Sequence, residues 1–364
     1  MGYLGVNVFF VLSGFVLAWQ VLQPAPSKQQ ESTVTSHTVP YAKFLRRRIL
    51  RVYPAYYACL TVLLFLSLWG IHPEPPRVTD VALHLVMFHN LIDKYVSSIN
   101  PVFWSMPFEW QFYLVFPFLV LALIRQRPFL LLGLGVGIAA LTNLAIVVGG
   151  AEAWTHVLLA QLPFRIDEFV VGMVGVKVAG AMPRRASLRA VTFWIGVLVL
   201  LGAVAYYATV APLWWTWDWT PFIRSFWVEA AVVAILVGLS GDVHFGSRLF
   251  ASRIMVWLGT ISYSIYLWHF PVLSWLASTT LVRQAGVTFD SMFTSLLTIG
   301  LALALAISAV SYYIIERPFH NAAQGSGAFS EIRIGAMRID GIKLLTLWGG
   351  GLMILAAVIA VVTN

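Results

Sequence analysis

The sequence predicts an all-α fold, a polytopic transmembrane helical bundle with about ten spans. Three observations support this prediction. Hydrophobic residues make up 60% of the chain and charged residues only 10%, whereas soluble domains carry about 25% charged residues. Apolar runs of about 20 residues, the length that crosses a bilayer, recur along the chain. The 15 tryptophans and 13 tyrosines suit the aromatic belts found where helices leave the lipid.

The expected spans follow one another with connections too short for a separate soluble domain. Pro and Gly interrupt some of them, which neighbouring helices can accommodate. We expect a membrane domain over residues 1–320, a cytoplasmic loop over 321–344 and an additional C-terminal transmembrane helix over 345–364. In chain order, the spans are expected at residues 5–23, 53–70, 104–124, 129–149, 166–182, 191–211, 226–240, 255–277, 292–314 and 345–363.

Lysine and arginine alternate between two sets of connecting segments, which predicts the topology. Cytoplasmic loops carry an excess of these residues, so we expect the segments rich in Lys and Arg on the cytoplasmic side of a bacterial inner membrane. This topology also places Met1 on the outer side, which a preceding helix absent from this chain would explain. Eighteen Lys and Arg lie in segments 24–52, 125–128, 177–190, 241–254 and 315–344, against four in segments 71–103, 150–164, 212–225 and 278–291.

The net charge of +8 is therefore expected to come from these loops rather than from a nucleic-acid site. A site for a polyanionic cofactor is a second possibility. We expect no metal site. Cys59 is the one cysteine and lies in an apolar run, where it suits a lipid-facing or a packing position. His84 and His89 are five residues apart, which puts them on different faces of one helix.

Four arginines gather at the inner mouth of the second expected span: Arg46, Arg47, Arg48 and Arg51. At helical spacing, Arg48 and Arg51 share a face. Their guanidinium groups could bind phosphates through paired hydrogen bonds. The alternative is a topology anchor that needs no ligand.

Charges within membrane helices are costly, so each is a functional hypothesis with an expected partner. Pro107 suits a first helical turn, so Glu109 would lie near the positive end of the helix dipole, with Tyr113 one turn deeper on the same face. Arg165 and Glu168, three residues apart, either pair with each other or form the polar wall of a substrate cleft.

Two further candidates lie later in the chain. His269, in the outer half of its span beside Trp268, is either a hydrogen-bonded structural group or a catalytic base. Glu316 and Arg317 end a span on the cytoplasmic side, where they could form a cap or an internal ion pair.

Five stretches in a fixed order carry a family pattern. They are Leu4–Phe15, which includes Ser13; Arg46–Pro54; Trp104–Tyr113; Ser262–His269, which includes Tyr266; and Tyr313–Phe319, which includes Glu316 and Arg317. Together they resemble the acyltransferase family 3 membrane proteins over residues 4–319.

This resemblance implies transfer of an acyl group, usually acetyl, from cytoplasmic acyl-CoA to a hydroxyl of a carbohydrate or glycolipid acceptor. It implies that Arg47, Arg48 and Arg51 meet the CoA phosphates. It also implies that Glu109, Arg165 and Glu168 line the pore or the outer acceptor side. The oligomeric state does not follow from the sequence.

One departure from the family concerns the catalytic base. The family's catalytic histidine lies in a helix before the Gly-Val-Asn-Val-Phe-Phe stretch, and this chain starts inside that stretch. We therefore expect the first family helix and its histidine to be missing, and Asn7 stands where Asp is frequent. His269 is the candidate that could substitute as the base that takes the hydroxyl proton.

Two rival functions fit the composition. A transporter or flippase for a glycolipid or small solute would also have spanning helices with intramembrane charges, and inverted repeats would favour it; we find none in the sequence. A non-catalytic remnant that assembles with a partner is the third hypothesis.

Overall fold

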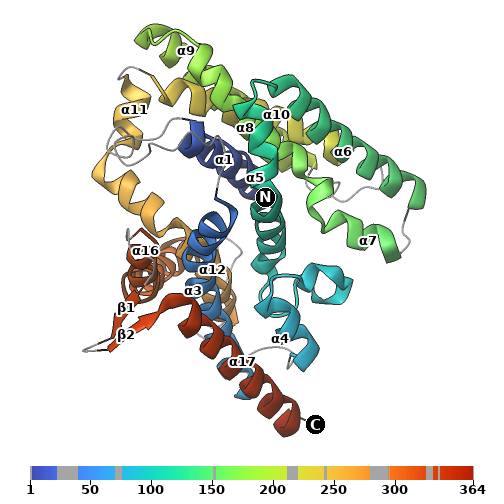
Figure 1. Cartoon of the computed structure of the whole chain (residues 1–364), viewed down its shortest axis with the longest axis vertical. Coiled ribbons are helices and arrows are strands. Elements are labelled where there is room, and N and C mark those ends of the chain that lie inside the picture. The colour runs from blue at the N-terminus through green and yellow to red at the C-terminus, as the bar shows by residue number, and fades with distance from the viewer. Residues whose placement is uncertain are drawn as a thin grey trace. The chain divides into compact units, whose positions relative to one another are not determined.

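The computed structural model of the chain describes residues 2–22, 40–69, 76–150, 153–210, 220–241, 244–278, 294, 296–324, 331–334 and 337–363. The chain forms two compact units (Figure 1). The first unit is Met1–Pro40 with Ser105–Met255, and the second unit is Tyr41–Trp104 with Val256–Asn364.

The first unit is a bundle of helices around α8. Helix α8 packs against α1, α6 and α10, and α10 packs in turn against α9. The helices are α1 (Gly2–Leu22), α5 (Met106–Ile124), α6 (Pro128–Gly149), α7 (Ala153–Leu159), α8 (Ile166–Ala181), α9 (Ala186–Val210), α10 (Thr220–Leu239) and α11 (Phe245–Phe250), with a 3-10 turn at Leu162–Phe164.

Helices α1 and α8 lie side by side (Figure 1), and one glycine of each helix lies against the backbone of the other. A Cβ atom on Gly14 of α1 would lie 2.0 Å from the carbonyl oxygen of Phe169. A Cβ atom on Gly172 of α8 would lie 2.0 Å from the carbonyl oxygen of Val11. Small residues permit such close approach between membrane helices. No side chain larger than hydrogen fits at either position while this packing is kept.

Arg189, at the start of α9, is a buried arginine whose donors bind backbone carbonyl oxygens. Its Nη1 donates to Val237 at 2.6 Å and its Nη2 donates to Ala179 at 2.9 Å, so the side chain joins α9 to α10 and α8. The charge-based prediction placed this arginine among cytoplasmic loop residues, but the structure gives it a packing role as well.

The second unit is built on α3 (Tyr41–Leu68), which packs against α16 and α17. The Tyr263 hydroxyl donates to the Val52 carbonyl at 3.0 Å, and Trp348 Nε1 donates to Thr61 Oγ1 at 2.9 Å. Cys59 is fully buried, as the packing interpretation predicts. The other elements are α4 (Val78–Leu85), 3-10 turns at His89–Leu91, Asp93–Tyr95 and Pro101–Ser105, α12 (Arg253–Ser278), α15 (Leu301–Ser311) between π turns at Leu296–Gly300 and Tyr312–Glu316, α16 (Arg317–Gln324), β1 (Glu331–Ile334), β2 (Met337–Asp340) and α17 (Gly341–Thr363).

The predicted helical membrane fold is confirmed, with one addition. Strands β1 and β2 form a short antiparallel hairpin within the expected loop 321–344. Among the described residues, seven helical runs are long and apolar enough to cross a membrane, so the count of about ten is not confirmed. Helices α8, α10 and α12 occupy the other three expected spans and are not among the seven; α8 has only 16 residues.

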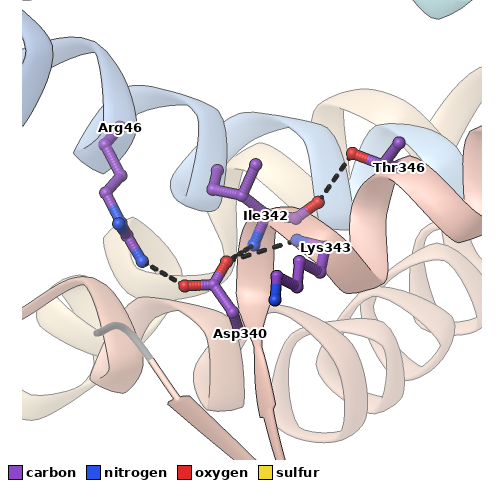
Figure 2. A network of polar contacts seen from close by, with 5 residues as sticks. All are labelled: Arg46, Asp340, Ile342, Lys343 and Thr346. Atoms are coloured by element: carbon purple, nitrogen blue, oxygen red, sulfur yellow. Dashed lines mark hydrogen bonds and ion pairs between the residues drawn. The ribbon is translucent and has the colours of Figure 1, made fainter.

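Helix α17 is fastened to α3 through Asp340, the last residue of β2 (Figure 2). One carboxylate oxygen of Asp340 accepts from the backbone N–H of Ile342 at 2.9 Å and of Lys343 at 3.2 Å, which caps the helix. The other oxygen accepts from Arg46 Nη2 at 2.5 Å. Burial alone would raise the pKa of this carboxyl, but the two N–H groups and the guanidinium outweigh it and hold the pKa below its ordinary value.

The glycine contact between α1 and α8 gives a first prediction. Gly14→Ala should destabilise the protein by about 1–3 kcal/mol, because the new methyl group overlaps a backbone carbonyl and forces the helices apart. The measurement is thermal unfolding of the detergent-solubilised chain. Gly5→Ala on the same helix is the matched control, because a Cβ there has no neighbour within 4 Å. Equal melting temperatures for the two variants would contradict the packing.

The Asp340 contacts give a second prediction. Asp340→Ala removes both cap and ion pair and should lower stability by about 1 kcal/mol or more. Asp340→Asn keeps a capping oxygen and should lose only the ion-pair part, about 0.2–1 kcal/mol. Because the folded-state pKa is depressed, this stabilisation is present above the ordinary carboxyl pKa and fades as the pH falls below about 4. Unfolding curves at neutral and acidic pH check this, and an unchanged gap between wild type and Asp340→Asn at pH 3 would refute it.

Candidate functional site

A buried polar cluster lies where α1 meets the start of α8 in the first unit. Asn7 Nδ2 donates to Glu168 Oε1 at 3.0 Å, and Arg165 Nη1 donates to the same oxygen at 2.8 Å. Asn7, Arg165 and Glu168 are 3%, 7% and 2% exposed. The predicted pairing of Arg165 with Glu168 is therefore confirmed, and the structure adds Asn7 as a third member from a distant part of the chain.

The chain before α8 places Arg165 in this position. Gln111 of α5 accepts from the backbone N–H of Leu162 and donates to Gln161, both at 2.8 Å, which fixes the short turn that ends at Arg165. The rings of Phe108 and Phe164 lie 5.9 Å and 5.5 Å from the guanidinium carbon of Arg165. Aromatic faces attract a cation at these separations, so the guanidinium is held by rings as well as by Glu168.

Glu109 and Tyr113 lie on one face of α5, as predicted, and the structure adds a hydrogen bond between them. Pro107 lies in the first turn of α5, Glu109 is buried in that turn, and the Tyr113 hydroxyl donates to Glu109 Oε1. Phe108, which contacts Arg165, is the residue next to Glu109. Glu109, Arg165 and Glu168 belong to the first unit, and neighbouring residues of α5 contact Arg165 through Phe108 and Tyr113 through Glu109.

Two buried carboxyl groups near this cluster were not among the predicted site residues. Asp167 and Glu229 are each 1% exposed. The negative charges of Asp167 and Glu168 repel a negative charge on Glu229 of α10. Glu229 could have been noticed in the sequence, since it is a lone carboxylate in the apolar run 226–240. Its neighbours could not, because α8 and α10 are far apart in the chain.

The arginine cluster lies on the first turns of α3 in the second unit, and the structure distinguishes its members. Arg46 is bound by Asp340, and Arg48 lies over the Phe44 ring at 5.3 Å. The sequence predicted that Arg48 and Arg51 share a face and that Arg47, Arg48 and Arg51 bind phosphates; in the structure Arg47 and Arg51 are exposed, whereas Arg48 is partly buried.

Glu316 and Arg317 take separate roles near this cluster. Glu316 is buried and accepts from the Ser264 hydroxyl, and the Arg51 charge acts on its carboxyl. Arg317 lies over the Tyr313 ring at 5.8 Å. The structure therefore favours a Glu316 contact between helices over either alternative expected from the sequence.

His269 of α12 is bonded to its own helix. Its Nδ1 lies 2.7 Å from the Tyr266 carbonyl oxygen and 3.1 Å from that of Ile265. Since carbonyl oxygens only accept, Nδ1 carries the hydrogen and the lone pair is on Nε2. The side chain thus has a structural bond and still presents the nitrogen that a base needs. Nearby, the Tyr266 hydroxyl donates to the Val102 carbonyl at 2.5 Å.

The other predicted site residues have less distinctive surroundings. Trp104 lies in the 3-10 turn before α5 and is partly buried. Ser13 lies on α1, one residue before the glycine that contacts α8, and is also partly buried.

The prediction for His84 and His89 was wrong in its geometry. Helix α4 ends at Leu85 and the chain reverses at Met87, whose φ is 56°, so the two rings stack with centroids 3.8 Å apart. His84 Nδ1 lies 3.0 Å from Asp80 Oδ1. Burial, followed by the neighbouring His84, lowers the pKa of His89 well below its ordinary value, so His89 is neutral near pH 7. Within the described ranges no three side chains are grouped to hold a metal ion.

Comparison with known proteins identifies the family to which the five ordered stretches belong. The model of an acyltransferase domain family matches residues 1–313. The peptidoglycan O-acetyltransferase OatA of Listeria monocytogenes is 25% identical over 354 residues, which cover 87% of this chain and 51% of OatA. The acyltransferase MdmB of Streptomyces mycarofaciens is 29% identical over 296 residues, which cover 75% of this chain and 68% of MdmB.

The chain spans about half the length of the first curated relatives it matches. No solved structure matches it.

The shared oxygen of Glu168 gives a third prediction. Glu168→Ala should destabilise the protein by about 3–5 kcal/mol, because it leaves the Arg165 guanidinium buried without its partner. The double variant Arg165→Met with Glu168→Leu should lose less than Glu168→Ala alone, since no uncompensated cation remains. Thermal unfolding of the solubilised variants measures both. A double variant that melts at or below the temperature of Glu168→Ala would contradict the prediction, because the buried cation would then not be the source of the loss.

Proposed function

The chain belongs to the acyltransferase 3 family, and from this premise we propose that it is a membrane O-acyltransferase. The acyl group, acetyl by default, moves from cytoplasmic acyl-CoA to a hydroxyl of a cell-surface or lipid-linked carbohydrate in a bacterial inner membrane. The observation that carries the donor side of this proposal is the pair of exposed arginines, Arg47 and Arg51, on the first turns of α3.

The names of the relatives support the reaction class. OatA is named a peptidoglycan O-acetyltransferase and MdmB an acyltransferase. The first implies an ester bond to oxygen and an acceptor made of carbohydrate, and both imply transfer of an acyl group. We carry over this chemistry and leave the identity of the acceptor open.

The donor end of the proposal rests on the arginines. Acyl-CoA is a polyanion, and guanidinium groups bind phosphate oxygens through two parallel hydrogen bonds. Arg47 and Arg51 are exposed and suited to this role, whereas Arg46 is bound by Asp340. Arg48 is partly buried at the same end of α3 and would complete the set.

The acceptor end of the proposal rests on the first unit. Glu109, Arg165 and Glu168 would orient the hydroxyl groups of the acceptor, since carboxylates accept and guanidinium groups donate hydrogen bonds. Each is already held in place, by Tyr113 in one case and by the shared Glu168 oxygen in the others. Side chains fixed in this way lose little freedom when they bind a substrate.

The reaction needs a group that moves one proton. The acceptor oxygen attacks the thioester carbonyl carbon, the C–O bond forms, the C–S bond breaks, and the hydroxyl proton ends on the departing CoA thiolate. A positioned base that takes the proton contributes about 10²–10⁴-fold to such a step. His269 is this chain's own candidate, because its Nε2 carries the lone pair.

The test of the donor site is binding of acetyl-CoA to the purified chain by calorimetry. Arg47→Ala and Arg51→Ala should each weaken binding about tenfold, the effect of losing one charge-assisted hydrogen bond. Arg125→Ala is the matched control, an exposed arginine of the first unit that the proposal gives no role. Equal losses of affinity in the control and test variants would show that the arginine cluster acts only as a general basic surface.

Transfer itself is measured as alkali-labile acetate on the envelope carbohydrate of cells that express the chain. Arg47→Ala and Arg51→Ala together should reduce this acetate in parallel with the loss of binding. Transport of labelled glycolipid with no ester acetate formed would favour the flippase alternative instead.

A further inference from the structure

Arg46 differs from Arg47 and Arg51 because a carboxylate from a distant part of the chain binds it. Asp340, the last residue of β2, lies 294 positions further along the chain, and its Oδ2 accepts from Arg46 Nη2 at 2.5 Å (Figure 2). Arg47 and Arg51 are exposed on the same first turns of α3. The cation beside the proposed donor site is therefore engaged by the protein itself.

The two carboxylate oxygens of Asp340 have separate roles. Oδ1 accepts from the backbone N–H groups of Ile342 at 2.9 Å and Lys343 at 3.2 Å, which caps α17. Oδ2 binds the guanidinium group of Arg46. Since the cap does not use the guanidinium group, Arg46 can leave Oδ2 while Asp340 keeps its place at the start of α17.

The ion pair is within reach of a dissolved anion. The side chains of Arg46 and Asp340 are 33% and 17% exposed. Water screens an ion pair at such a surface, so the pair adds little net stability. A phosphate group forms two parallel hydrogen bonds with a guanidinium group, and these are among the strong hydrogen bonds in proteins. A phosphate group can therefore replace Asp340 as the partner of Arg46.

Acyl-CoA carries phosphate at two places, which suits the arrangement of the arginines. One is a diphosphate, and the other is a phosphate monoester with about 1.5–2 negative charges near pH 7. Arg47 and Arg51 are four residues apart and share a face of α3. Arg46 lies about 100° around the helix from Arg47. One ligand can thus place one phosphate centre against Arg47 and Arg51 and the other against Arg46.

We propose that Asp340 is an affinity-determining residue of the donor site: its carboxylate binds Arg46 in the free protein, and a phosphate group of acyl-CoA displaces it. Asp340 therefore weakens donor binding by the free energy needed to separate it from Arg46. This inference rests on the proposed function, because it takes the arginine cluster as the site of acyl-CoA.

The position of Asp340 in the chain gives the proposal a regulatory meaning. The family model matches residues 1–313, and Asp340 lies beyond them, at the start of a helix that packs against α3 and α4. A residue outside the matched region thus adjusts a site inside it. When the donor binds, Asp340 loses its guanidinium partner but keeps the cap, so occupancy of the donor site reaches α17.

Binding of acetyl-CoA to the purified full chain in a non-ionic detergent, measured by calorimetry, tests the proposal. Asp340→Asn keeps a capping oxygen and removes the charge, so it should tighten binding about 1.5- to 5-fold, the equivalent of one exposed ion pair. Asp340→Ser also caps a helix without a charge and should give the same gain. Asp93→Asn is the matched control, an exposed carboxylate of the second unit whose loss changes the net charge equally and should leave affinity unchanged.

A double-variant cycle shows whether the gain passes through Arg46. In the Arg46→Ala background, Asp340→Asn should give no gain, because the cation that it releases is absent. A gain of the same size in both backgrounds would mean that only the net charge matters, and it would overturn the proposal. Unchanged or weaker binding by Asp340→Asn and Asp340→Ser would also overturn it, because the carboxylate would then position Arg46 rather than compete for it.

Failure of this proposal is distinguishable from failure of the proposed function. If Arg47→Ala and Arg51→Ala weaken binding while the Asp340 variants do not tighten it, the donor site stands and the role of Asp340 is refuted. If acetyl-CoA binds to neither wild type nor any variant, the donor site itself is refuted, and the role of Asp340 falls with it.

Discussion

One carboxylate oxygen, Oε1 of Glu168, organises the first unit. It receives a hydrogen bond from α1 through Asn7 and one from the start of α8 through Arg165. These groups can meet only because Gly14 and Gly172 let the two helix backbones touch. A low-dielectric interior makes a satisfied polar contact strong and an unsatisfied one costly. The close packing and the polar contact therefore depend on each other.

The aromatic residues around this contact extend the same constraint to α5. Phe169, next to Glu168, stacks on Phe10 with ring centroids 4.5 Å apart and on Phe112 with centroids 4.1 Å apart. Phe108 adds its face to the Arg165 guanidinium. The rings pack the three helices together around the ion pair, which is buried. A site built on such rigid elements can orient a substrate without prior rearrangement.

Local spacing along the helices predicted the pairs within one helix or turn. It could not predict the contacts between residues that are far apart in the sequence. The pairs Arg165–Glu168 and Glu109–Tyr113 follow from helical periodicity, so the sequence was enough to find them. Asn7 and Glu168 are 161 positions apart, and Arg46 and Asp340 are 294 positions apart. No local pattern reports such contacts. The stacked pair of His84 and His89 was missed for another reason, because one residue with positive φ ended the helix that the spacing argument assumed.

The glycines at the α1 and α8 interface also limit how this protein can change over evolutionary time. The obstacle to a larger residue at position 14 or 172 is a backbone carbonyl, which every amino acid has. A substitution there cannot be rescued by trimming a neighbouring side chain. Gly135 of α6 differs, because the atoms that a Cβ would meet belong to the side chain of Val170. A larger residue at position 135 can therefore be suppressed by a second substitution, because a smaller residue at position 170 restores the space. No such second-site suppressor exists for positions 14 and 172.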